Sequence, residues 1–337
     1  YKQIVKKLNQ CNIDFFAVSN LAEAMEIRKI STSDILILGY TQPDKATVLA
    51  NNNITQAVFS YEYAKKLDLY AKAENCFVKA HYKIDTGMSR LGFRDIEELY
   101  SALSLENIVP AGIFTHLSSA DMDDAQSKQF TANQVNIFKD IISKLKERNI
   151  EIPLVHLQNS AGISCLDLNY NYVRAGIIMF GYPPSDVPLT FDIMPVMEVK
   201  SVVAMVKTIE KGTAVSYARN FIAPNTMKIA TVPIGYADGY SRMLSNKSEV
   251  LIKGKRAKVL GNICMDQMMI DVSHIDNVAE GDIVTIVGED GDEFIGFNEL
   301  ADIMGSISYE LMCLISRRVP RVYCSKGEIV DIVDYLA

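Results

Sequence analysis

The sequence predicts a two-part α/β protein: a (β/α)₈ barrel over residues 1–186, followed by a β-rich domain over residues 187–337. Two observations predict it. In the first part, short apolar runs alternate with helical patterns, which is typical of parallel strands joined by helices. In the second part, the apolar runs are separated only by Gly, Asn and Asp turns, which is typical of a domain made mostly of strands.

The first part opens on an amphipathic helix that carries Ile4, Val5 and Leu8 on one side. In a (β/α)₈ barrel such a helix follows a strand. We therefore expect the first strand and its loop to precede Tyr1, which would bring the strands to the eight that close a barrel. The other seven candidates are the runs 14–19, 35–39, 55–59, 77–85, 111–115, 155–158 and 172–177.

Helices are predicted between most of these strands. The clearest is 20–29, where Glu23 stands at capping-box spacing, and the others are 61–70 and 126–148. In the second part, two short helices are predicted at 297–304 and 309–316, before the segment 318–323. The β-like runs there are 195–210, 229–234, 250–252, 257–261, 268–272 and 283–287.

Composition narrows the range of functions. The chain has 337 residues, 49% of them hydrophobic, and a net charge of −7 with no basic stripe, which argues against a nucleic-acid partner and for a small-molecule substrate. No apolar run approaches the ~20 residues of a membrane span. The six cysteines form no C-x-x-C pair, which favours reduced thiols in a cytoplasmic protein over disulfides or a metal site.

The ends of the last two barrel strands indicate a phosphate site, because barrels often bind phosphate there. Asn159 and Ser160 follow the strand at 155–158, and Gly176 and Ile177 close the run that contains Arg174. Small residues and a hydroxyl at two adjacent strand ends can bring backbone N–H groups to an anion. Taken alone, Ser160 fits an ordinary helix cap equally well, and Gly176 fits a packing glycine.

Polar residues also follow other strands. Lys83 and Arg90 lie at and beyond the end of the run 77–85, and His116 follows the run 111–115. A lone histidine more often belongs to a core, but a position at a barrel strand end favours a site role. The second part offers three further candidates for the site, Tyr217, Met265 and Asp266. Their positions in the sequence alone do not show whether they have a functional role.

Eight motifs in order along the chain resemble the alanine racemases. They are KIDTGMSRLGF (83–93), THLSSAD (115–121), HLQNSAG (156–162), VRAGIIMFG (173–181), AVSY (214–217), IATVPIGYADGYSR (229–242), GNICMDQMMIDV (261–272) and RRVPRVY (317–323). As a set they are highly specific and cover the whole chain. The resemblance implies a barrel followed by a β domain, the cofactor pyridoxal 5'-phosphate, and a homodimer in which the second domain of each chain completes the partner's site.

The resemblance also implies roles for the catalytic residues. Tyr217 matches the family's tyrosine base, which acts on one face of the substrate α-carbon and comes from the partner chain. Arg174 matches the arginine that faces the cofactor's ring nitrogen, where a permanent positive charge disfavours protonation and restrains transamination. His116 and His156 match a hydrogen-bonded chain that runs from the tyrosine toward Arg174 and supports its action as a base.

The remaining matches concern binding. Asn159, Ser160, Gly176 and Ile177 match positions around the cofactor phosphate. Arg90 matches a residue beside the cofactor ring oxygen and the substrate carboxylate, and Lys83 matches a lysine that is carbamylated in some members. Met265 and Asp266 match the backbone that receives the substrate carboxylate.

Three departures accompany the resemblance. The family's motif K-A-x-A-Y-G-H-G, with the lysine that binds the cofactor, is not found in residues 1–337, so we expect it upstream of Tyr1 together with the first strand. Arg317 stands where many members have a tyrosine close to the phosphate. Asn262 stands where many have an arginine in the substrate entrance.

These observations favour an alanine racemase that supplies D-alanine for cell-wall peptidoglycan by moving the α-proton between two bases. The alternative is a serine racemase, such as the catalytic part of the membrane-anchored enzymes associated with vancomycin resistance, because Arg317 and Asn262 change the polarity of the entrance. A third hypothesis is a pyridoxal-phosphate protein without activity. The presence of Tyr217 and Arg174 argues against it.

Overall fold

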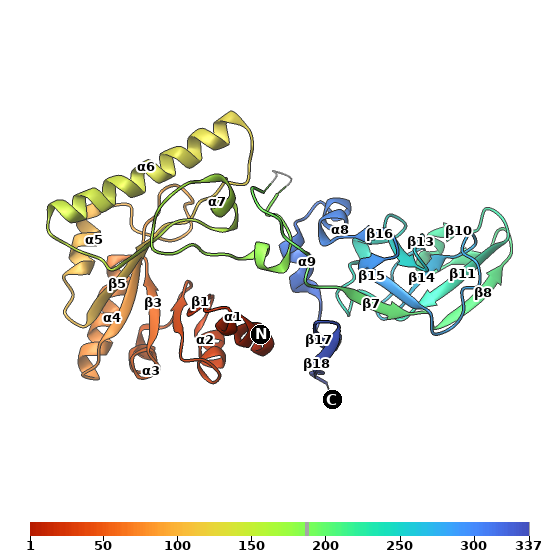
Figure 1. The fold of residues 1–337 in the computed structure, drawn as a ribbon, viewed down its shortest axis with the longest axis horizontal. Helices are drawn as coiled ribbons and strands as arrows, with labels where there is room; N and C mark the ends of the chain where they lie inside the picture. Colours follow the sequence, from red (N-terminus) through yellow and green to blue (C-terminus); the bar gives the residue numbers. More distant parts are fainter. Residues whose placement is uncertain (186–188, 337) are drawn as a thin grey trace. The chain divides into compact units, whose positions relative to one another are not determined.

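The computed structural model describes residues 1–185 and 189–336, which form two compact units (Figure 1). The first comprises Tyr1–Ile178 and Pro183–Asp192, and the second comprises Met179–Tyr182 and Ile193–Ala337. The boundary that the sequence predicts between residues 186 and 187 lies outside the described residues.

The first unit is a half-barrel: a parallel sheet of six strands in the order β1 to β6, with helices along its outer side (Figure 1). Each of the first six predicted strand runs overlaps one of these strands, with ends that differ by up to three residues. The strands are β1 (Phe15–Val18), β2 (Asp34–Ile37), β3 (Ile54–Val58), β4 (Val78–Lys83), β5 (Ile108–Phe114) and β6 (Leu154–His156). The helices are α1 (Lys2–Gln10), α2 (Leu21–Arg28), α3 (Ala46–Asn51), α4 (Tyr61–Ala73), α5 (Ile96–Leu103), α6 (Ala125–Glu147) and α7 (Ser160–Cys165).

The prediction of a seventh regular strand at 172–177 is wrong. Tyr172 forms only an isolated bridge with His156, and a 3₁₀ helix covers Ile177–Phe180. Beside that bridge, the side-chain Oδ1 of Asn171 accepts the hydrogen bond from the N–H of Val155, and the N–H of Asn171 donates to the carbonyl of Val155. The described residues therefore form a six-stranded half-barrel, and the closed (β/α)₈ barrel stays a prediction.

Side-chain caps explain where several helices begin. The Oδ1 of Asn20 accepts from the N–H of Glu23, whose carboxylate in turn accepts from the N–H of Ser19, so the cap is reciprocal but reaches one residue beyond the N–H of a standard capping box. Ser60 and Asp124 cap α4 and α6 through the N–H groups three residues on. In the part of the chain that the structure describes, no helix combines the length and the apolar character needed to cross a bilayer.

The two faces of the sheet differ in chemistry, and this difference places the site. On β4, Tyr82 faces outward, where its hydroxyl donates to the carbonyl of Ala102 on α5. His81 and Lys83 alternate with it and therefore point to the inner face. That face also holds an apolar cluster around Phe114, against which the ring of His156 stacks. At the carboxyl ends of β4, β5 and β6 the inner face therefore holds basic side chains beside an aromatic ring, since Lys83, Phe114 and His156 are register partners.

The second unit is built on an antiparallel sheet in the order β16-β15-β12-β13-β14-β11-β8, with β7 paired to β15. Every predicted β-like run overlaps at least one strand. The structure adds three features that the sequence did not predict: the hairpin of β9 and β10, strand β16, and strand β18, which pairs with β17. The strands are β7 (Val199–Val202), β8 (Met205–Ile209), β9 (Ala214–Val215), β10 (Phe221–Ile222), β11 (Met227–Val232), β12 (Glu249–Ile252), β13 (Lys255–Leu260), β14 (Met268–Asp271), β15 (Ile283–Asp290), β16 (Glu293–Ile295), β17 (Arg321–Ser325) and β18 (Glu328–Val333), and the helices are α8 (Phe297–Met304) and α9 (Ser308–Leu314).

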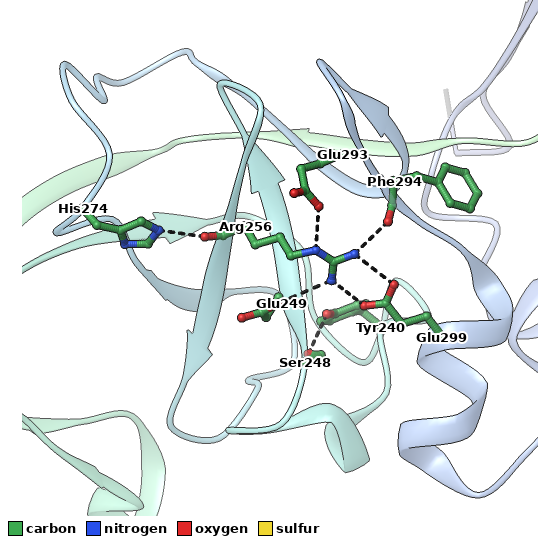
Figure 2. A network of polar contacts seen from close by, with 8 residues as sticks. All are labelled: Tyr240, Ser248, Glu249, Arg256, His274, Glu293, Phe294 and Glu299. Atoms are coloured by element: carbon green, nitrogen blue, oxygen red, sulfur yellow. Dashed lines mark hydrogen bonds and ion pairs between the residues drawn. The ribbon is translucent and has the colours of Figure 1, made fainter.

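One arginine ties this sheet to helix α8 (Figure 2). The guanidinium of Arg256, on β13, donates to Glu293 at 2.8 Å, to Glu299 at 2.7 Å and to the carbonyl of Phe294 at 2.8 Å. These carboxylates raise the pKa of Arg256. Because the fork of a guanidinium can serve several acceptors at once, this side chain joins β13, β16 and α8 and holds the scaffold of the unit.

Candidate functional site

Basic side chains gather at the carboxyl ends of β4, β5 and β6. Lys83 is the last residue of β4, His116 follows β5, and His156 is the last residue of β6. Parallel strands end at the same edge of a sheet, so these residues become neighbours although they are far apart in sequence. Arg174 joins them because its N–H donates to the carbonyl of Gln158. The structure thus brings together four residues that the sequence predicts for one site.

The guanidinium of Arg174 is held only by neutral acceptors. One nitrogen, Nη1, lies 2.7 Å from Nδ1 of His156. The other, Nη2, donates to the carbonyls of Thr115 at 2.7 Å and Leu157 at 3.0 Å and lies 3.4 Å from Nδ1 of His116. Burial lowers the pKa of Arg174 to about 10, so the group is charged at neutral pH. Among the described residues no carboxylate pairs with it, which leaves a positive charge available to a ligand.

A third histidine, His81, which was not among the predicted site residues, extends this chain. Arginine only donates, so His156 must accept at Nδ1 and carry its proton on Nε2. That nitrogen lies 2.9 Å from Nδ1 of His81, which must therefore accept and carry its own proton on Nε2. The only signal for His81 in the sequence is its position two residues before Lys83, which places both on one face of a strand.

All three histidines of the site are neutral. Burial, followed by the charge of Arg174, lowers the pKa of His81 to about 4 and that of His116 to about 3. The same two causes lower the pKa of His156 well below its ordinary value. The imidazoles therefore act as fixed hydrogen-bonding groups, and the positive charge of the chain stays on Arg174.

These lowered pKa values predict a loss of stability in acid. Between pH ~4 and ~6.5 the unfolded chain protonates the three histidines and the folded protein does not, so the free energy of unfolding should fall as the pH falls, by about 1.4 kcal/mol per pH unit for each histidine. Urea titrations of the apoprotein at pH 7, 6 and 5 measure this dependence. The variant His81→Asn should show a slope smaller by about one proton. A slope equal to that of the unchanged protein would contradict the assignment.

Lys83 and Arg90 add to the positive charge. The pKa of Lys83 is lowered to about 8, first by burial and then by the charges of Arg90 and Arg174. A substantial fraction of this amine is therefore uncharged near pH 8, as a carbamylated lysine requires before it reacts. Arg90 is exposed in a loop held by Asp85, whose carboxylate accepts from two backbone N–H groups and from Arg94.

The predicted phosphate residues lie next to one another. The N–H of Gly176 donates to Oγ of Ser160 at 2.9 Å, and a Cβ on Gly176 would lie 3.3 Å from that oxygen. Ser160 therefore still has its own O–H to donate. The side chain of Asn159 is already partly used, because it caps α7 through Gly162 and donates to the carbonyl of Leu117. Its backbone carbonyl accepts from the N–H of Ile163, so the backbone N–H and the second Nδ2 hydrogen of Asn159 are the donors it can offer a ligand. Ile177 is buried beside this pair.

Gln134, which was not among the predicted site residues, supports the loop that carries His116. It is fully buried on α6. Its Nε2 donates to the carbonyl of His116 and to Oγ1 of Thr86, both at 3.2 Å, and its Oε1 accepts from the N–H of Ser118 at 3.1 Å and from its hydroxyl at 3.3 Å. All four hydrogen-bonding positions of the amide are used, which fixes the loops after β4 and β5.

The other candidates lie in the second unit. Tyr217 is 71% exposed, in the turn between β9 and β10, and Met265 is 52% exposed. The carboxylate of Asp266 pairs with Arg318 at 2.7 Å, so its backbone, rather than its charge, is free for a substrate carboxylate. Arg317 is exposed, with its guanidinium 5.6 Å from the centre of the Tyr335 ring.

Comparison with known proteins identifies both parts of the chain. The N-terminal domain of alanine racemase matches residues 1–184, and its C-terminal domain matches residues 196–323. Alanine racemase 2 of Caldanaerobacter subterraneus subsp. tengcongensis is 40% identical over 342 aligned positions, which cover 99% of this chain and 87% of the relative.

Solved structures agree with these matches. The alanine racemase of Clostridium difficile 630 superposes with a TM-score of 0.92 at 38% identity, over 99% of this chain and 88% of that chain. The alanine racemase of Bacillus anthracis with bound L-Ala-P superposes with a TM-score of 0.88 at 35% identity, over 95% of this chain and 83% of that chain.

Proposed function

The chain belongs to the alanine racemase family, and from this we propose that it interconverts L- and D-alanine. The observation that carries the proposal is the match, over nearly the whole chain, to relatives of about 40% identity that are alanine racemases. The basic cluster at the strand ends supports it, because the substrate carries a carboxylate and the cofactor of the family carries a phosphate.

The residues of the first unit fit pyridoxal 5'-phosphate. The charge on Arg174 has no carboxylate partner among the described residues, and Ser160 with Gly176 offers a hydroxyl and a close backbone approach. We infer that Arg174 faces the ring nitrogen and that Ser160, Gly176, Ile177 and the backbone of Asn159 hold the phosphate. When bound, the cofactor withdraws electrons from the substrate α-carbon and so makes its hydrogen acidic.

The protein's own groups then position and move the proton. Tyr217 takes or returns it at its phenol oxygen on one face of the substrate. Arg174 stays charged because the histidines around it are neutral acceptors that take no proton from it. Arg90, next to Lys83, and the backbone at Met265 and Asp266 hold the substrate carboxylate. Arg317 lies near the phosphate in this proposal.

Assembly follows from the roles proposed for the two units. Arg174 belongs to the first unit and Tyr217 to the second. We infer a homodimer in which Tyr217 of each chain serves the cofactor site of its partner. A symmetric pair gives two equivalent sites and closes without forming a filament.

The alternative of a serine racemase rests on Arg317 and Asn262, which change the polarity proposed for the substrate entrance. The relatives named above are alanine racemases, which favours alanine as the substrate.

Steady-state racemisation by the holoenzyme tests the proposal. Alanine should turn over faster than serine, by about 10-fold or more, since a pocket shaped for a methyl group gains nothing from an added hydroxyl. The control for a true racemase is that reactions started from L-alanine and from D-alanine both end in equal amounts of the two enantiomers. Faster turnover of serine, or none of alanine, would overturn the proposal.

A further inference from the structure

We propose that Asn262 is a positioning residue for Tyr217: its side-chain amide clamps the strained turn that presents the tyrosine. The inference rests on the function proposed for Tyr217. It also gives the departure at residue 262 a structural role within the second unit.

The turn around Tyr217 has an unfavourable backbone. It spans residues 216–220 between the two-residue strands β9 and β10, which pair Val215 with Phe221. Ser216 has φ 65° and ψ −176°, a backbone conformation that residues other than glycine rarely adopt. Ala218 and Arg219 follow with φ 59° and 50°. Three such residues around one tyrosine persist only if their surroundings hold them.

Asn262 supplies that hold from both sides of Tyr217. Its Nδ2 donates to the carbonyl of Tyr217 at 2.8 Å, and its Oδ1 accepts from Nδ2 of Asn220 at 2.9 Å. Its own carbonyl accepts from the hydroxyl of Ser216. One residue thus binds the beginning, the middle and the end of the turn, and it is itself only 7% exposed.

A second layer supports the clamp. Nδ2 of Asn246 donates to the carbonyl of Asn220 at 3.1 Å, and its Oδ1 accepts from the N–H of Gly261 at 2.6 Å. Gly261 has φ 72°, and a Cβ there would lie 2.8 Å from Cβ of Ser216. Only glycine allows the strand before Asn262 to approach the turn this closely.

Tyr217 depends on this backbone because its side chain packs against little. With 71% of the residue exposed, contacts within this chain leave the ring free, so the backbone of the turn is what fixes the point from which the phenol extends. A change of a few degrees at the backbone moves the hydroxyl, at the far end of a long side chain, by enough to disturb proton transfer.

The test compares Asn262→Asp and Asn262→Ala with Asn225→Ala, which alters an exposed asparagine of the same unit. Asn262→Asp keeps the acceptor for Asn220 and removes the bond donated to Tyr217, so it separates the clamp from general loss of folding. The first readout is backbone hydrogen exchange of residues 214–222, followed by mass spectrometry without cofactor or substrate. Both variants at 262 should exchange about 10-fold faster there, and Asn225→Ala should not.

The second readout is exchange of the substrate α-hydrogen in the holoenzyme. Exchange should fall about 10- to 100-fold for the enantiomer that Tyr217 serves and stay within about 3-fold for the other. Unchanged backbone exchange overturns the clamp, whether or not the protein racemises alanine. Equal loss with both enantiomers, alongside faster backbone exchange, overturns its link to Tyr217. Absence of turnover in the unaltered holoenzyme overturns the proposed function instead.

Discussion

Tyr217→Phe is expected to lower α-hydrogen exchange from one enantiomer of alanine by about 10²- to 10⁴-fold, the usual contribution of a positioned general base. Exchange from the other enantiomer should persist, because a different group removes its proton. Phenylalanine keeps the ring and loses only the hydroxyl. The free energy of unfolding should stay within about 0.5 kcal/mol of the original value, since the residue is 71% exposed.

The measurement is exchange of the α-hydrogen in deuterium oxide, followed separately from L- and D-alanine by NMR. Tyr70→Phe is a suitable control because Tyr70 is also exposed but lies on α4, on the outer side of the half-barrel. If Tyr217→Phe slowed both enantiomers to the same extent, Tyr217 would not be the base for one face.

Arg174→Ala is expected to reduce racemisation by at least about 10²-fold, because it removes the charged group that hydrogen-bonds to the histidine chain. It should also raise the pKa of His116 and His156, since the charge of Arg174 contributes to lowering both. Arg174→Lys keeps a positive charge, but an ammonium group cannot reach the four acceptors that the guanidinium of Arg174 contacts. Its activity should therefore lie between that of the unaltered enzyme and that of Arg174→Ala.

Nitrogen NMR of histidine-labelled protein measures these pKa values directly, because the chain has only four histidines. Arg148→Ala is the control: this arginine stacks on Tyr100, on the outer helix α5. Titration of His116 at its original pH in Arg174→Ala would show that the arginine does not govern the electrostatics of the site.

The sequence predicts a structural feature correctly where all the residues that cause it lie in one short segment. The capping pair of Asn20 and Glu23 lies within four residues, and the structure has both hydrogen bonds. The same holds for helix α8, whose predicted bounds are those observed. The apolar runs for β1 to β6 were also found, because a buried parallel strand is apolar along its length.

Features that depend on distant residues could not be predicted this way. The run 172–177 looks like a strand, yet whether it pairs depends on Asn171 and on β6, seventeen residues earlier in the chain at Leu154. His81 becomes part of the site only because β4 and β6 bring it to His156 across β5. Sequence spacing carries no information about that contact.

Asn262 shows the same limit for a departure from a family pattern. In sequence it reads as a lost positive charge at the substrate entrance. In the structure its amide holds the turn of Tyr217, a contact between residues 45 positions apart. The sequence shows that an asparagine at position 262 is unusual for the family. Its role follows only from the groups it contacts in the structure.

The most direct test of the whole account is to mix two inactive proteins, Tyr217→Phe and Arg174→Ala, under conditions of proven subunit exchange. If Tyr217 of one chain serves the site of its partner, each mixed dimer has one site with both residues intact. Random exchange should then restore about a quarter of the original racemase activity, because about half the dimers are mixed and each has one working site. No recovery above the sum of the two separate proteins would contradict the account.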